Sequence, residues 1–156
     1  MKQAAARSGV DPEEAVRRMH APLTALMSRP VVCVSPEDSA EAALRLLVEH
    51  GISGLPVVDA YRRPVGMISR ADLLEERLEA LTEGELGTPP QVRDLMTQQA
   101  VSLTETALVR EAAALMASYG MHRVPVLSPE GAVVGIVSTL DVLRWIAGTE
   151  ALASFE

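Results

Sequence analysis

Apolar residues at helical and strand-like spacing divide the chain into two halves of the same plan. In the first half, an i, i+3, i+4, i+7, i+8 series predicts a helix with one buried stripe. Gly51 is placed to end this helix as a left-handed cap, with Ile52 closing back onto Leu47. The apolar positions of the series are Ala40, Ala43, Leu44, Leu47 and Val48.

Short apolar runs on either side of that helix predict strands over residues 31–34, 55–58 and 65–68. Residues 35–38, Ser-Pro-Glu-Asp, form the expected cap of the helix, with Pro inside its first turn. A second helix is expected over residues 69–81. The predicted order of the first half is therefore strand, helix, strand, strand, helix.

The second half repeats this order at a constant offset of 69 residues. Strands are predicted near residues 100–103, 124–127 and 133–137, and helices near 108–119 and 139–147. A constant offset over most of the chain is a stronger indication of architecture than any short motif. Identical residues at this offset include Met27 and Met96, Gly51 and Gly120, Pro56 and Pro125, and Asp72 and Asp141.

An additional helix is predicted before the repeats. Asp11 is a candidate N-cap, Pro12 suits the first helical position, and the acidic residues that follow suit the positive end of the helix dipole. The helix should extend to about His20 and pack on the outside of the domain or on a partner chain.

The predicted fold class is α/β (α+β): two β-α-β-β-α repeats packed as one pseudo-twofold domain, with the extra N-terminal helix. One such unit exposes an apolar sheet face, and two units bury those faces against each other. The expected boundaries are 1–22 for the N-terminal arm and helix, 23–81 for the first repeat, 82–91 for a linker, 92–147 for the second repeat and 148–156 for the C-terminal tail.

Composition narrows the classes of function. The net charge of −7, an aromatic content of 3% and the lack of an extended Lys/Arg cluster argue against a nucleic-acid partner. No apolar run is long enough for a membrane span and the N-terminus lacks the apolar core of a signal peptide, so a cytoplasmic protein with no membrane partner is expected. Cys33 is expected to be a small, buried strand residue. Scattered histidines and the lack of a phosphate loop or nucleophile elbow predict neither a metal site nor catalysis.

The motif Gly-x-x-Ser-x-x-Asp occurs once in each half, at residues 66–72 and 135–141. An apolar pair precedes each serine, so the motif predicts a strand that continues into a helix. The serine is a candidate N-cap and the aspartate completes a capping box. Such a helix start also suits anions, because its unpaired N–H groups point outward. Capping and ligand contact both remain open for each aspartate.

Together with Leu-Pro-Val-Val at 55–58 and Met-His-Arg-Val-Pro-Val at 121–126, these motifs resemble the CBS domain, and their tandem arrangement resembles the Bateman module. The resemblance covers about Leu23 to Ala147. It implies clefts between the paired repeats that take an adenosine-containing regulatory ligand, AMP, ADP, ATP or S-adenosylmethionine, with no required cofactor.

The resemblance also implies which residues contact such a ligand. The aspartate accepts hydrogen bonds from the ribose hydroxyls, the Ser/Thr group lies near the phosphates, and the first strand and the Pro-Val strand hold the base. His122 and Arg123 match phosphate-contacting positions and, by the pseudo-twofold, are expected to serve the cleft of Asp72. The implied ligand-binding residues are Ser69, Asp72, Ser138, Thr139, Asp141, His122, Arg123, Met121, Val32 and Val101.

The two halves differ at the phosphate positions, because Ser53 and Gly54 stand where the second half has His122 and Arg123. The cleft that lacks His and Arg is therefore expected to be empty or to hold an uncharged end of the ligand. Cys33 and Ser102 also stand where the family often has threonine.

The implied function is that of a non-enzymatic, ligand-sensing module that signals to a partner such as an enzyme or a transporter. Two alternatives remain: a dimerisation or docking module with vestigial, empty clefts, and a helper of an enzyme such as inosine monophosphate dehydrogenase, whose catalytic barrel this chain lacks. Apolar residues of the corner helices predict a homodimer. These residues are Leu74, Leu78, Leu81, Leu143, Trp145 and Ile146.

Overall fold

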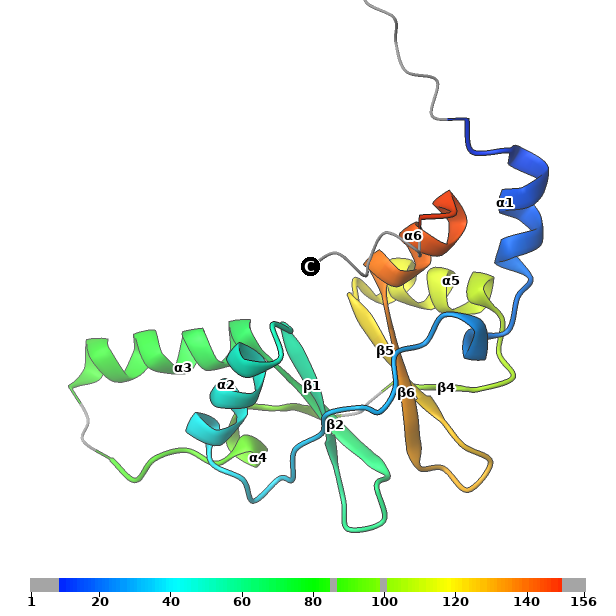
Figure 1. Cartoon of the computed structure of the whole chain (residues 1–156). Coiled ribbons are helices and arrows are strands. Elements are labelled where there is room, and N and C mark those ends of the chain that lie inside the picture. Colours follow the sequence, from blue (N-terminus) through cyan, green and yellow to red (C-terminus); the bar gives the residue numbers. More distant parts are fainter. Residues whose placement is uncertain (1–8, 85–86, 99–100, 150–156) are drawn as a thin grey trace, which may run out of the picture.

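The computed structural model describes residues 9–84, 87–98 and 101–149, and these form two similar halves, each built on a three-stranded sheet (Figure 1). The predicted fold class and the tandem repeat are confirmed. The elements of the first half are α2 (Ala40–Glu49), β1 (Gly54–Val58), β2 (Pro64–Ser69) and α3 (Arg70–Glu83). Those of the second half are α5 (Val109–Tyr119), β5 (Arg123–Leu127), β6 (Val133–Ser138) and α6 (Thr139–Ala147).

The segment that leads into each repeat packs on the other repeat. The 3₁₀ turn η1 (Leu23–Ala25) begins the first repeat, but Leu23 is fully buried in the core of the second half. The short helix α4 (Val92–Leu95) begins the second repeat, but Val92 is fully buried in the core of the first. Because the repeats exchange these segments, each core is completed by residues from the neighbouring repeat.

The two sheets are extended in the same way. An antiparallel hairpin, β1–β2 or β5–β6, forms the centre of each sheet. The strand β3 (Thr97–Gln98) enters the first sheet by antiparallel pairing with β2, although it belongs to the chain segment that leads into the second repeat. Ser28, 69 residues earlier, makes the equivalent bridge with Ile136 of β6. The exchange is therefore reciprocal and gives the domain its pseudo-twofold symmetry.

The first strand of each repeat is shorter than predicted. Residues 31–34 make a single bridge, between Val34 and Val57, because Val31 and Val34 enter different hydrophobic cores. In the second repeat, β4 (Leu103–Thr104) pairs parallel with β5 and lies at the end of the strand predicted over 100–103, whose first residue lies outside the described part of the chain.

Helix α2 begins later than the sequence pattern predicts. The Ser35 amide donates to Oδ2 of Asp38 at 2.8 Å, so the expected capping residues form a separate turn. The N-cap is Ser39, whose Oγ accepts from the Ala42 amide at 3.0 Å. The end of the helix is as predicted, since Gly51 has φ of 62° and the Ile52 amide donates to the Leu47 carbonyl at 3.0 Å. Two apolar positions of the predicted stripe stay exposed, Leu44 at 45% and Val48 at 65%.

Helix α1 (Pro12–Met19) precedes the repeats and packs against α6 and α5 of the second half (Figure 1). The predicted N-cap is confirmed, because the Glu13 amide donates to Oδ1 of Asp11 at 3.1 Å. The helix lies on the outside of the domain, as expected, and none of its residues is buried. Among the described residues, no helix combines the length and the apolar character that crossing a membrane would require.

A third, smaller core joins the two halves. Val31, Val58 and Val133 are buried together, so residues from both repeats contribute to it. Near the hairpin loops, the Val133 amide donates to the Arg62 carbonyl at 2.9 Å. This contact fixes the hairpins side by side, as Figure 1 shows, and sets the position of the candidate site between the repeats.

Candidate functional site

Both Ser-x-x-Asp corners form capping boxes. In the first repeat, the Ser69 amide donates to Oδ2 of Asp72 at 2.7 Å, and the Asp72 amide donates to Oγ of Ser69 at 3.2 Å. In the second, the Ser138 amide donates to Oδ2 of Asp141 at 2.8 Å, and the Asp141 amide donates to Oγ of Ser138 at 3.1 Å. Each aspartate therefore fixes the start of its own helix.

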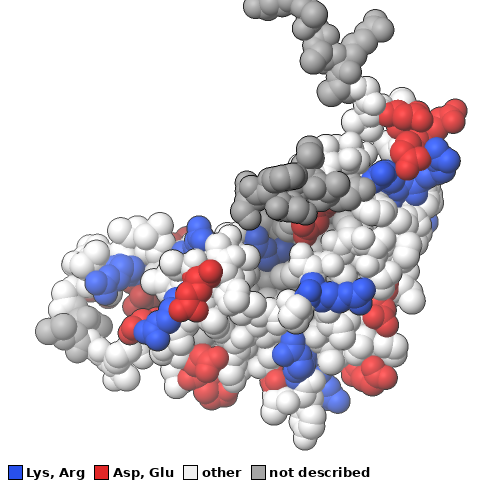
Figure 2. Space-filling view, viewed as in Figure 1, with Lys and Arg blue, Asp and Glu red and all other residues white. Residues whose placement is uncertain are grey.

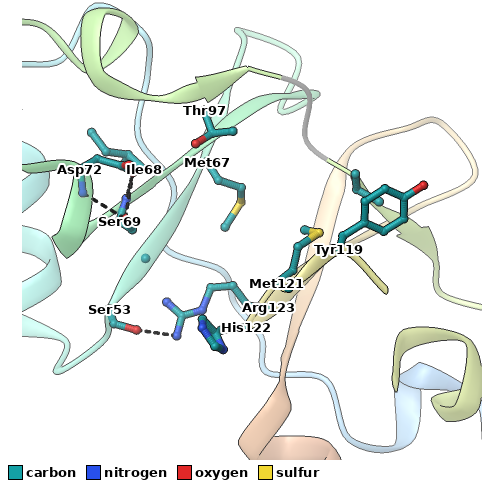
Figure 3. A pocket seen from close by; sticks show the side chains of 13 residues that line it. Ser53, Met67, Ile68, Ser69, Asp72, Thr97, Tyr119, Met121, His122 and Arg123 are labelled. Carbon is teal, nitrogen blue, oxygen red and sulfur yellow. Dashed lines mark hydrogen bonds between the residues drawn. The ribbon is translucent and has the colours of Figure 1, made fainter. Parts of the chain in front are cut away.

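In the first repeat, the corner also lies against a cavity. A hollow of about 410 Å³ lies between the repeats, and Ser69 and Asp72 line its first-repeat side (Figure 3). This volume is within the range of about 300–1,000 Å³ that is typical of small-molecule sites. The residues that line the cavity are Ser53, Gly54, Met67, Ile68, Ser69, Asp72, Thr97, Val101, Tyr119, Gly120, Met121, His122 and Arg123.

The walls of the cavity differ in character. Met67 on β2 and Met121 before β5 extend toward the same space from opposite repeats (Figure 3). Val101 and the exposed ring of Tyr119 add further apolar surface from the second repeat. The charged side chains, Asp72 and Arg123, lie at the start of α3 and at the start of β5, so the cavity combines an apolar middle with charged ends.

Arg123 extends from the second repeat toward the first. Its Nη2 donates to Oγ of Ser53 at 2.7 Å (Figure 3). Burial lowers the pKa of the Arg123 guanidinium, Asp141 opposes that shift and Arg70 adds to it. The group stays charged because the ordinary arginine pKa is far above neutral. A half-buried cation at the edge of a cavity is a candidate contact for an anionic group.

The structure brings six of the ten predicted site residues together in this cavity: Ser69, Asp72, Val101, Met121, His122 and Arg123. His122 and Arg123 share the cavity with Asp72, the arrangement that the pseudo-twofold leads one to expect. The other four lie outside it. Ser138 and Asp141 form the second capping box, Thr139 donates to the His122 carbonyl at 3.2 Å, and Val32 packs against the first core.

Seven residues of the cavity wall were missed by sequence reasoning. Met67 and Ile68 lie between the glycine and the serine of the corner motif, so their position beside it could have indicated them. Thr97 and Tyr119 carry no local signal, because their place depends on how the repeats pack. Ser53 stands at a phosphate position of the repeat, but that position was assigned to the cleft without His and Arg. The remaining two are Gly54 and Gly120.

A family profile described as the CBS domain matches this chain twice, at residues 23–79 and 92–148. The chain belongs to the CBS-domain family. The two matches coincide with the two halves of the fold, so the domain is a CBS pair. The capping-box corners at Ser69 and Ser138 occupy equivalent places in its two CBS domains.

Sequence relatives of this CBS pair include much longer enzymes. Inosine-5'-monophosphate dehydrogenase from the archaeon Korarchaeum cryptofilum is 39% identical over 114 residues, which are 73% of this chain and 22% of the dehydrogenase. An uncharacterised protein of Methanopyrus kandleri is 30% identical over 116 residues, 74% of this chain and 58% of that protein. The chain thus spans between about a fifth and three fifths of the length of these relatives.

Solved CBS pairs have the same architecture. The CBS domain pair of protein MJ0100, in complex with 5'-methylthioadenosine and S-adenosyl-L-methionine, is similar with a TM-score of 0.71 and 27% identity, over 84% of this chain and 99% of that one. CBSX2 from Arabidopsis thaliana, in complex with AMP, gives a TM-score of 0.67 and 30% identity, over 86% and 98% of the two chains.

The surface of the CBS pair carries charges of both signs. On the face shown in Figure 2, acidic and basic side chains are interspersed over both repeats. The part of the chain that the structure describes contains no group of three or more His, Cys, Asp or Glu side chains that could hold a metal ion.

Proposed function

We propose that this CBS pair is a regulatory module, without catalytic activity of its own, that binds an adenosine-containing ligand and passes its occupancy to a partner protein. The observation that carries this proposal is the presence of Asp72 and Arg123, from different repeats, at one cavity of about 410 Å³. The solved relatives that bind AMP, or 5'-methylthioadenosine and S-adenosyl-L-methionine, support the ligand class.

Asp72 is suited to a ribose. Its Oδ2 atom accepts the bonds of the capping box, whereas Oδ1 receives no hydrogen bond from the described residues. A carboxylate has about four acceptor positions, so the same side chain can cap the helix and accept from both hydroxyls of a cis-diol. Hydrogen bonds to a charged group contribute about 1.5–3 kcal/mol each. Capping and ligand contact are therefore compatible at this corner.

The apolar middle of the cavity is suited to a nucleobase. Met67 and Met121 face it from opposite repeats, and Val101 adds a third apolar side chain. Methionine adapts its shape and makes favourable sulfur contacts with aromatic rings. A bound base would thus contact both repeats at once. Ligand binding can therefore change the position of one repeat relative to the other.

Calorimetry and thermal unfolding with AMP, ADP, ATP and S-adenosylmethionine test this function. A ligand at about 100 times its Kd should stabilise the chain by about 2.7 kcal/mol. Asp72→Asn should abolish that stabilisation, whereas Asp94→Asn, which changes the cap of α4 away from the cavity, should keep it. If none of the four ligands stabilises the protein at millimolar concentration, the ligand-sensing function is wrong and the docking module with empty clefts is favoured.

We also propose that the chain forms a homodimer through the exposed side of α3. Leu74, Leu78 and Leu81 are 60%, 55% and 68% exposed on this helix, which is unusual for three leucines on one element. On α6, Leu143 is 57% exposed, whereas Trp145 and Ile146 are only partly exposed and also pack against the second core. Light scattering tests the dimer, and Leu74→Glu with Leu78→Glu should give a monomer.

A further inference from the structure

Arg123 contacts Ser53, which is the direct neighbour of Gly54, and Gly54 is the counterpart of Arg123 in the first repeat. Ser53 and Gly54 in the first repeat correspond to His122 and Arg123 in the second. The long side chain of Arg123 therefore lies over the pseudo-symmetric counterpart of its own position. Because one repeat supplies the arginine and the other supplies the space, this arrangement can occur on one side of the pseudo-twofold axis only.

Gly54 supplies the space. A Cβ atom at this position would lie 2.7 Å from Nη1 and 3.4 Å from Cδ of Arg123, and 3.4 Å from the Ile68 carbonyl oxygen. The first distance is shorter than a normal contact, so any side chain at position 54 would displace the guanidinium. Gly54 is buried in β1, and Arg123 occupies the space where a side chain at position 54 would lie.

Ser53 supplies the hydrogen bond, and backbone hydrogen bonds hold the chain on both sides of its side chain. Its carbonyl accepts from the Arg70 amide at 3.0 Å, at the first residue of α3. It follows directly after Ile52, whose amide closes the end of α2 onto Leu47. The hydroxyl of Ser53 is thus placed by two helix ends of the first repeat, and it accepts from Nη2 of Arg123 at 2.7 Å.

One fixed donor orients the whole guanidinium. The group is planar and carries five N–H donors, so a single short hydrogen bond together with the contact to Gly54 limits the direction of the others. A free arginine side chain loses rotamer entropy when it is ordered. A site in which Arg123 is already ordered avoids that loss on binding.

We propose that Ser53 and Gly54 are positioning residues that hold the Arg123 guanidinium at the cavity and thereby make it selective for an anionic group on the ligand. This inference rests on the proposed function, since it concerns the end of the adenosine ligand that is remote from Asp72. The ligand class is an adenosine phosphate. Neutral adenosine gains nothing from Arg123, and S-adenosylmethionine offers it a single carboxylate beside a repelling sulfonium and ammonium. Because only the second repeat has the arginine and only the first has the glycine, each chain has one such anion-selective site.

The test compares AMP with adenosine by calorimetry on the full chain. Wild type should bind AMP more tightly than adenosine or S-adenosylmethionine, with one AMP site per chain. Ser53→Ala should raise the Kd for AMP about tenfold, because the released guanidinium must then be ordered when AMP binds, and the Kd for adenosine by less than about twofold. Ser53→Thr, which keeps the hydroxyl, should restore the affinity for AMP.

Gly54→Ala tests the same point by a different route, because it leaves the Ser53 hydroxyl in place and displaces the guanidinium by contact. This variant should also raise the Kd for AMP and leave the Kd for adenosine nearly unchanged. Ser118→Ala, on the exposed side of α5, is the matched control and should change neither affinity. Thermal unfolding of the free variants verifies that they are folded.

The outcomes separate this inference from the proposed function. If wild type binds adenosine and AMP but Ser53→Ala weakens both by the same factor, or weakens neither, the positioning role is wrong while ligand sensing stands. A wild type that prefers S-adenosylmethionine over AMP also overturns the selectivity. If wild type binds none of the three, the proposed function fails and the selectivity fails with it.

Discussion

Arg18 and Trp145 exchange two hydrogen bonds across 127 positions of the chain. Nη1 of Arg18 donates to the Trp145 carbonyl at 2.8 Å, and Nε1 of Trp145 donates to the Arg18 carbonyl at 2.8 Å. The guanidinium also lies 5.0 Å from the centre of the indole ring. This pair attaches α1 to α6, and it explains why a helix with no buried residue has a defined place on the second repeat.

Replacement of Arg18 should therefore release α1. The cation–π contact contributes about 0.5–1 kcal/mol and a hydrogen bond about 1 kcal/mol, so Arg18→Ala should weaken the attachment by about 1–2 kcal/mol. Trp145 is the only tryptophan of the chain, so its fluorescence emission should move to longer wavelength in the variant. Arg17→Ala, on the exposed side of the same helix, should leave the emission unchanged. Equal emission from both variants would contradict the assignment.

A glycine in β2 gives a second prediction. A Cβ atom on Gly66 would lie 2.6 Å from the Thr97 carbonyl oxygen and 2.9 Å from Sδ of Met96, so Gly66→Ala would force β3 away from β2. Overpacking of this kind typically destabilises a protein by about 1–3 kcal/mol. Urea unfolding measures the loss, and Gly87→Ala, which meets no atom within 4 Å, is the control. A Gly66→Ala variant as stable as the control would show that β3 does not hold its place beside β2.

The exchanged segments give a third prediction. Leu23 is the first residue of the first repeat but is fully buried in the core of the second, where its amide donates to the Ala107 carbonyl at 2.9 Å. Leu23→Ala should destabilise the domain by about 2–5 kcal/mol, the usual range for a buried leucine. Hydrogen exchange should show the largest loss of protection in α5 and β5. Leu44→Ala, at a position that is 45% exposed, should cost far less. A loss of protection confined to the first repeat would argue against the exchange.

Cys33 gives a prediction about pH. Burial raises the pKa of its thiol, and the nearby Arg62 guanidinium partly opposes this shift. Because the folded state raises the pKa, the related stability is present below the ordinary thiol pKa and is lost as the pH rises through the folded value. Iodoacetamide at pH 8 should therefore modify Cys33 several-fold more slowly in the folded protein than in the urea-unfolded chain. Equal rates would mean that the thiol is accessible and unshifted.

Local sequence was sufficient wherever a feature depends on residues that are close in the chain. The capping boxes of Ser69 and Ser138 and the left-handed cap at Gly51 were predicted because their hydrogen bonds span five residues or fewer. The same holds for α6, whose predicted and observed bounds agree at Thr139–Ala147. The prediction failed at residues 31–34, where the apolar run is divided between two cores that no local pattern distinguishes.

By itself, the sequence determined the two repeats, the order of their elements and the two corners, because a constant offset and local capping are properties of the chain alone. The tertiary structure decided that Leu23 of the first repeat completes the core of the second, and that Val92 of the second completes the core of the first. It also decided that Asp72, Tyr119 and Ser53 line one cavity with Arg123. Those relations depend on how two apolar sheets pack and on where a single glycine leaves room. Such packing joins residues from about 50 to more than 80 positions apart, a range over which hydrophobic periodicity carries no information about contact.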